Sequence, residues 1–196
     1  MNDSTATARQ ILTTFLAIVA ERGLAATTTK VIAEAAGVNE VTIFRLFTDK
    51  AGVVMAAFRV FDLAGKLEAC AITVDAATPA SAAASLLTVL RSLREQLHIH
   101  RALVQFGVSE YQKYPQLRDE AAKGPAAARH ILSVTLESLR PQLRPEVDIP
   151  TTVLSLMGFL LLTALWSQNG WLDQSGDIAD SQLAKLIDPL INWNNL

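Results

Sequence analysis

The side chains with the most informative types and spacing lie in residues 28–47, TTKVIAEAAGVNEVTIFRLF. Two short stretches with helical apolar spacing, 28–36 and 40–47, are separated by Gly37-Val38-Asn39. A glycine permits the left-handed backbone that a tight turn between two helices requires, and asparagine is a good cap for the helix that follows. Small Ala33 lets the two helices approach closely. The segment therefore predicts a helix-turn-helix, because a plain helical hairpin needs no glycine flanked in this way.

The other residues that could do chemistry form weaker patterns. Of the three histidines, His98 and His100 lie two positions apart, so they point in different directions on a helix, and His130 is remote from both in sequence. The chain has no HExxH, no CxxC and no phosphate-binding glycine loop. Its one cysteine, Cys70, cannot form an intramolecular disulfide, which favours a reducing, cytoplasmic compartment. We expect no enzyme activity, no metal site and no cofactor.

The elements that must position these residues are all predicted to be helices. Apolar side chains recur at helical spacing along almost the whole chain, and no sustained alternation indicates a strand. Thr7 and Gln10 form a capping-box pattern, Gly23 suits a helix C-terminus, and Asp148 can cap the helix that begins near Pro150. The fold class is therefore all-α, with helices expected at about 7–23, 28–36, 40–47, 49–73, 79–97, 98–113, 125–140, 150–166 and 178–193.

The composition excludes several classes of protein. The chain has 196 residues, of which 51% are hydrophobic and 18% charged, so it can bury a substantial core and is not a disordered chain. A net charge of −2 gives no overall sign of a nucleic-acid partner. The most apolar stretch, 153–166, is shorter than the about 20 residues that a membrane-spanning helix needs. We expect a buried helix there, no membrane partner, and no export signal in MNDSTATARQ.

Residues 11–53 resemble the TetR family of transcription regulators. The resemblance rests on Gly23, Thr27-Thr28, Ile32-Ala33, Ala36-Gly37-Val38, Thr42-Ile43-Phe44, Phe47 and Lys50. It implies a three-helix helix-turn-helix DNA-binding domain over residues 1–53, with its motif at 28–47. It also implies a helical effector-binding and dimerisation domain over residues 54–196, where the match is only one of length and helical architecture.

The resemblance implies a set of residues that bind double-stranded operator DNA. Arg45 is the best candidate for reading a base, because a guanidinium can contact guanine O6 and N7 together, whereas Glu40 could accept a hydrogen bond from a cytosine amine. Lys50 resembles a backbone anchor. The family commonly has serine, glycine and tyrosine where this chain has Asn39, Val41 and Phe44. The complete set is Thr27, Thr28, Lys30, Asn39, Glu40, Val41, Thr42, Phe44, Arg45 and Lys50.

The remaining helices are expected to bind an effector and a second subunit. The large side chains that could line an effector cavity are Phe58, Phe61, Leu90, Leu97, Phe106, Tyr111, Met157, Phe159 and Trp166. Charged residues are scarce there, so the expected effector is apolar. The helix at 153–166 is apolar nearly all round and contains Ser155 and Gly158, so a second helix can pack closely against it. The last two helices are therefore predicted to form an isologous homodimer.

Together these features predict a cytoplasmic, dimeric repressor that a small apolar effector releases from a palindromic operator. The alternative is a dimeric helical ligand-binding or interaction module with weak or lost DNA binding. This alternative is consistent with Phe44 and with the charges of residues 1–70, where seven Lys and Arg are balanced by seven Asp and Glu.

Overall fold

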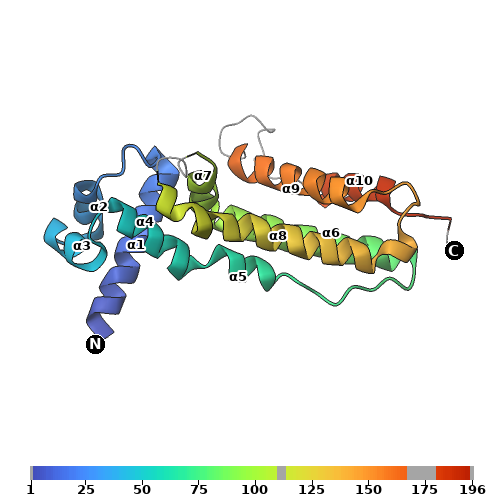
Figure 1. Ribbon diagram of the computed structural model, residues 1–196, viewed down its shortest axis with the longest axis horizontal. Coiled ribbons are helices and arrows are strands. Elements are labelled where there is room, and N and C mark those ends of the chain that lie inside the picture. Colours follow the sequence, from blue (N-terminus) through green and yellow to red (C-terminus); the bar gives the residue numbers. More distant parts are fainter. Residues whose placement is uncertain (1, 110–113, 167–179, 195–196) are drawn as a thin grey trace. The chain divides into compact units, whose positions relative to one another are not determined.

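The computed structural model describes residues 2–109, 114–166 and 180–194. Within these ranges the regular structure is helical, and the only β-type pairing is one isolated antiparallel bridge between Leu143 and Ile191 (Figure 1). The all-α prediction is confirmed. Contacts divide the chain into two compact units, Met1–Leu63 with His100–Ala122 and Ala64–Ile99 with Lys123–Leu196.

The first unit is built on α1 (Asn2–Arg22), α2 (Thr29–Ala36), α3 (Glu40–Phe47), α4 (Lys50–Phe61) and α7 (Arg101–Ser109). The apolar spacing of α1 places Ile11, Phe15 and Val19 along one face. This face is buried against α2 and α4, so the spacing in the sequence accounts directly for the packing. Residues of the same core that are fully buried include Ile32, Ile43, Val53, Val54 and Ala57.

A distant segment, residues 100–122, completes the core of the first unit. Leu103 and Phe106 of α7, together with Leu117 of a short 3₁₀ turn, are almost fully buried in the core that α1 and α4 form. The rings of Phe58 and Phe106 meet edge to face, with centroids 5.5 Å apart. The core of the first unit therefore includes residues on both sides of position 53.

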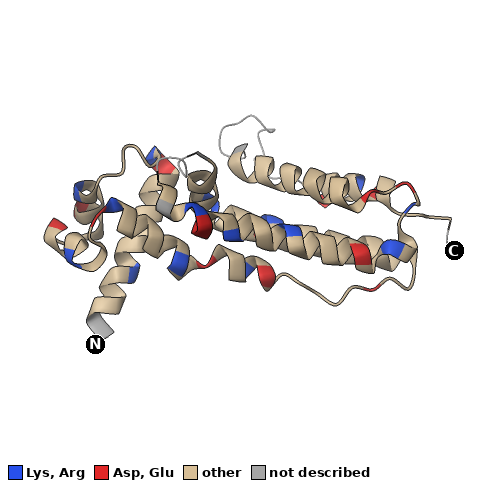
Figure 2. Ribbon diagram, in the orientation of Figure 1, with Lys and Arg blue, Asp and Glu red and all other residues tan. Residues whose placement is uncertain are grey.

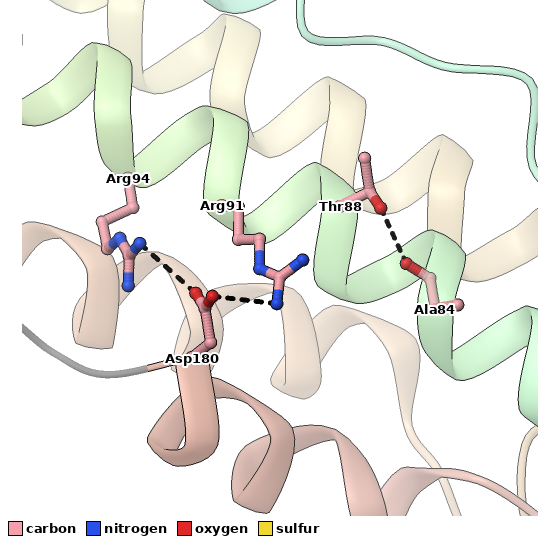
Figure 3. Close-up of polar contacts among 5 residues, drawn as sticks. All are labelled: Ala84, Thr88, Arg91, Arg94 and Asp180. Carbon is pink, nitrogen blue, oxygen red and sulfur yellow. Dashed lines mark hydrogen bonds and ion pairs between the residues drawn. The ribbon is translucent and has the colours of Figure 1, made fainter.

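The second unit contains α5 (Leu63–Glu68) from Ala64 onward, α6 (Pro79–Ile99), most of α8 (Arg118–Ser138), α9 (Ile149–Trp166) and α10 (Asp180–Ile187). Helix α6 packs against both α9 and α10 through the leucine stripe that the sequence predicts. Arg91 and Arg94 of α6 lie 2.9 Å and 3.4 Å from the carboxylate of Asp180, the first residue of α10 (Figure 3). These exposed ion pairs contribute only about 0–1 kcal/mol each, so buried leucines provide the main stabilisation.

Several helix boundaries differ from the sequence prediction. Helix α1 begins at Asn2 and not at Thr7, because no glycine or proline interrupts residues 2–22. The single helix predicted at 49–73 is two helices, α4 and α5, separated by Asp62 with a left-handed φ of 42°. Helix α8 begins at Arg118 and contains Pro125, which removes one backbone hydrogen bond without ending the helix. The predicted ends at 110–113 and 178–179 lie outside the described residues.

Helix α9 begins as predicted. The Asp148 carboxylate accepts a hydrogen bond from the Thr151 backbone N–H at 2.9 Å. The hydrogen bonds from Thr151 lower the pKa of Asp148, so the carboxylate stays ionised and keeps capping the helix under mildly acidic conditions. Among the described residues, no helix is both long enough and apolar enough to span a membrane.

Candidate nucleic-acid interface

The turn between α2 and α3 has the geometry that the sequence predicts. Gly37 takes a left-handed φ of 66° and ends α2, and the Val38 N–H donates to the Ala33 carbonyl at 3.0 Å. The Asn39 side chain then caps α3, with its Oδ1 accepting from the Val41 N–H at 2.9 Å. The helix-turn-helix at residues 28–47 is therefore present, and each of its turn residues has a specific backbone role.

The two threonines at the start of α2 have different environments. Thr28 is exposed and caps α2, with its Oγ1 accepting from the Val31 N–H at 3.2 Å. Thr27 is fully buried, and its hydroxyl donates to the Gly23 carbonyl at 2.8 Å. Thr27 thus fastens the loop to the end of α1, and its hydroxyl does not face solvent where a phosphate would bind. Thr28 and the exposed Lys30 remain available at the N-terminus of α2.

Glu40 has a structural contact that the sequence analysis missed. The Thr29 hydroxyl donates to the Glu40 Oε1 at 2.7 Å, and Glu40 is only partly exposed. This hydrogen bond joins the first residue of α2 to the first residue of α3, which are 11 positions apart in sequence. No recognised motif marks a threonine and a glutamate at that spacing, so only the three-dimensional structure brings the pair together.

Two further side chains brace the motif against its neighbours. The Lys50 ammonium donates to the Leu24 carbonyl at 2.6 Å and so links the start of α4 to the loop before α2. The Gln10 amide donates to the Ala36 carbonyl at 3.0 Å and links α1 to the C-terminal end of α2. Lys50, which the resemblance suggests as a DNA backbone anchor, is engaged here in holding the fold. The sequence analysis interprets Gln10 only as part of a helix cap, because its partner here is 26 residues away.

The outward side of α3 presents Val41, Phe44 and Arg45, which we call the reading face. These residues follow the i, i+3, i+4 spacing that places side chains on one side of a helix. Val41 is 69% exposed and Phe44 48% exposed, and Arg45 is exposed as well. On the opposite side Ile43 is fully buried, while Thr42 is partly exposed. The helix thus offers two apolar groups and one guanidinium to a partner.

The charges around the reading face are mixed. Lys and Arg are interspersed with Asp and Glu over the helices of the first unit (Figure 2).

The one cysteine of the chain, Cys70, is buried in the second unit. Burial raises the pKa of its thiol, which makes it a poor nucleophile. The described part of the chain contains no group of three or more His, Cys, Asp or Glu side chains able to hold a metal.

The residues proposed for an effector cavity are divided between the two units. Phe58, Phe61 and Phe106 belong to the first unit. Leu90, Leu97, Met157 and Phe159 belong to the second, where the two leucines are buried and the other two side chains are partly buried. Tyr111 and the side chain of Trp166 lie outside the described residues.

Part of the first unit matches the model of a known protein family. Residues 11–57 match the family model described as "Bacterial regulatory proteins, tetR family". This segment includes α2, α3 and the turn between them, and it supports the resemblance drawn from the sequence. No curated protein matched the chain.

Solved structures share the fold over nearly the whole chain. The ketosteroid transcriptional regulator KstR2 of Mycobacterium tuberculosis is 19% identical, with a TM-score of 0.69 over 94% of this chain and 95% of that one. The fatty acid degradation regulator FadR from Bacillus halodurans is 18% identical, with a TM-score of 0.65 over 94% of each chain. A TetR-family regulator from Rhodococcus sp. is 21% identical, with a TM-score of 0.67 over 95% of this chain and all of that one. At these identities the comparison establishes the fold.

Proposed function

Because the chain carries the helix-turn-helix segment of the tetR family of transcriptional regulators, we propose that it is a cytoplasmic, dimeric repressor released from operator DNA by a small apolar effector. The observation that carries the proposal is the reading face of α3, which is exposed and mounted on a braced turn. The arrangement suits insertion of α3 into a major groove, with two subunits reading half-sites about 34–36 Å apart.

Each part of the motif has a physical role in this proposal. Arg45 is the only cation of the reading face, and its guanidinium can bind guanine with two hydrogen bonds. Thr28 and Lys30 lie at the N-terminus of α2, where backbone N–H groups and the helix dipole favour a phosphate. These contacts fix the position of the protein on the duplex, while α3 provides the sequence preference.

The charge balance favours a second candidate, a dimeric helical ligand-binding or interaction module with weak DNA binding. Residues 1–70 have no net charge, so non-specific attraction to DNA is small. Specific binding then depends on a few well-placed contacts. The two candidates differ in one observable, the enrichment of a defined DNA sequence.

Selection of bound duplexes from random DNA tests the proposal. We expect enrichment of a palindromic sequence whose half-site centres are about one helical turn, or a multiple of it, apart. A heat-unfolded sample provides the background control. If the folded wild-type protein enriches no sequence at low salt, the repressor proposal fails and the interaction module becomes the better explanation.

Dimerisation is proposed to use the last two helices, with α9 supplying the apolar contact. Val153, Leu156 and Leu160 are buried within the second unit, yet Leu154 is 72% exposed and Leu162 43% exposed on the opposite side of α9. Gly158 lies between these two leucines, and a methyl group added there would meet no other atom within 4 Å. This exposed stripe suits close packing against the same stripe of a second subunit.

Replacing Leu154 with arginine is expected to convert the dimer to a monomer at micromolar concentration, because a charge would be buried in place of the most exposed leucine of the stripe. Sedimentation velocity measures the change. The matched control is Ile72→Arg, an equally drastic change at an exposed isoleucine outside α9, which should remain dimeric. A dimeric Leu154→Arg protein would rule out α9 as the interface.

Effector control is proposed to act through α4. This helix follows the DNA-binding motif directly and shares a core with α7, in which Phe58 of α4 contacts Phe106. Movement of α7 would therefore be transmitted to α4 and change the separation of the two reading faces. Coupling of this kind is typically worth about 1–3 kcal/mol. An apolar effector fits the charge-poor residues named for the cavity.

A further inference from the structure

We propose that Val41 and Phe44 recognise the 5-methyl groups of thymine, and that Glu40 is a positioning residue that reads no base. The inference rests on the proposed DNA binding by α3 and specifies what its surface recognises. It follows from two observations, namely the contact that holds Glu40 and the apolar character of the reading face.

Glu40 is fixed at the junction of α2 and α3. Its Oε1 accepts the Thr29 hydroxyl at 2.7 Å, and the side chain is only partly exposed. A hydrogen bond to an ionised carboxylate is among the stronger ones in proteins, so moving this side chain toward a base would sacrifice a favourable contact. Glu40 thus sets the orientation of α3 relative to α2, which decides where the reading face lies.

The reading face is suited to an apolar base edge. Val41 and Phe44 are one turn apart and are 69% and 48% exposed, a large apolar surface for so short a helix. In the major groove the thymine methyl is the largest apolar group on the edge of an unmodified base. Packing valine or phenylalanine against an amine or a carbonyl would instead remove that polar group from water without a partner, which is unfavourable.

Arg45 adds a polar contact beside this apolar pair. It lies four residues after Val41, so both side chains are on the same side of α3 and are separated along the helix by about 6 Å. That distance corresponds to about two base-pair steps at about 3.4 Å each. The expected half-site therefore has thymine within one or two base pairs of the guanine that Arg45 contacts.

Uracil substitution in the selected operator tests the inference, because it deletes only the 5-methyl group of thymine. At the thymine that lies within two base pairs of the guanine, we expect the wild-type protein to lose about fourfold in affinity per half-site, the value of one buried methyl group. The Val41→Ala variant should show less than half of this loss at the same position, since it lacks the group that packs against the methyl. Uracil at thymines outside the half-sites serves as the control.

Glu40→Gln and Glu40→Ala test the positioning role. The glutamine can still accept the Thr29 hydroxyl, so its ranking of the four bases at every position should match that of wild type. The alanine variant should lose affinity for all sequences, and Thr29→Val should reproduce that loss. A changed preference for cytosine in Glu40→Gln, or an unchanged wild-type affinity with every uracil substitution, would overturn the inference. Failure of the wild-type protein to bind any DNA would instead refute the proposed function.

Discussion

Replacement of Arg45 with alanine is expected to weaken binding to the selected operator by about 5- to 150-fold for each half-site. Arg45 is the only charged side chain of the reading face, and its guanidinium can form two hydrogen bonds with one guanine. Because the residue is exposed, the variant should fold and dimerise like wild type. Fluorescence anisotropy with labelled operator measures the affinity, and sedimentation measures the assembly.

The pattern of the loss distinguishes base reading from simple charge attraction. A matched control is Lys30→Ala, which removes one exposed cation from α2. This variant should bind all sequences more weakly to a similar extent. The slope of log affinity against log salt concentration should become smaller in magnitude by about one. Arg45→Ala should in addition relax the preference for guanine at one position of each half-site. Equal affinities of wild type and Arg45→Ala would refute the assignment of Arg45 as the base-reading residue.

The parts of the fold that could be predicted from sequence are those set by local interactions. Gly37 with a left-handed backbone, Asn39 as the cap of α3 and Asp148 as the cap of α9 each act on backbone groups within a few residues. Their energetic role is therefore visible in a short stretch of sequence. The leucine stripe of α6 is predictable for the same reason, because helical periodicity alone decides which side is buried.

The contacts that brace the candidate site could not be predicted in this way. Thr29 with Glu40, Lys50 with the Leu24 carbonyl, and α7 with α1 each join residues between 11 and about 90 positions apart. Such pairs depend on how the helices cross, which periodicity does not determine. This explains why Glu40 and Lys50, interpreted as DNA contacts from their types and positions, have structural partners as well.

The environment of Thr27 shows the same limit at a single residue. A threonine just before a helix is a reasonable phosphate ligand by type, yet the fold turns it inward to the Gly23 carbonyl. The next residue, Thr28, faces solvent and caps the helix. One position along the chain separates the two environments, and the difference arises from how the loop after α1 is packed.

Replacing Ile43 with alanine is expected to lower the free energy of unfolding of the first unit by about 2–5 kcal/mol, the usual range for a fully buried isoleucine. Ile43 is the only fully buried side chain of α3, which has eight residues and would be marginal as an isolated helix. The position of α3 therefore depends heavily on this side chain. Denaturant unfolding, together with amide hydrogen exchange in α3, measures the loss.

The neighbouring Val41→Ala variant separates the stability of α3 from its recognition of DNA. Both substitutions truncate a β-branched apolar side chain in the same helix, but Ile43 is fully buried whereas Val41 is 69% exposed. Val41→Ala should therefore leave the unfolding free energy within about 0.5 kcal/mol of wild type. Ile43→Ala should instead accelerate amide exchange throughout α3 and weaken binding to every sequence alike. If Ile43→Ala were as stable as Val41→Ala, polar contacts would have to hold α3 in place. These contacts are the Asn39 cap and the hydrogen bond between Thr29 and Glu40.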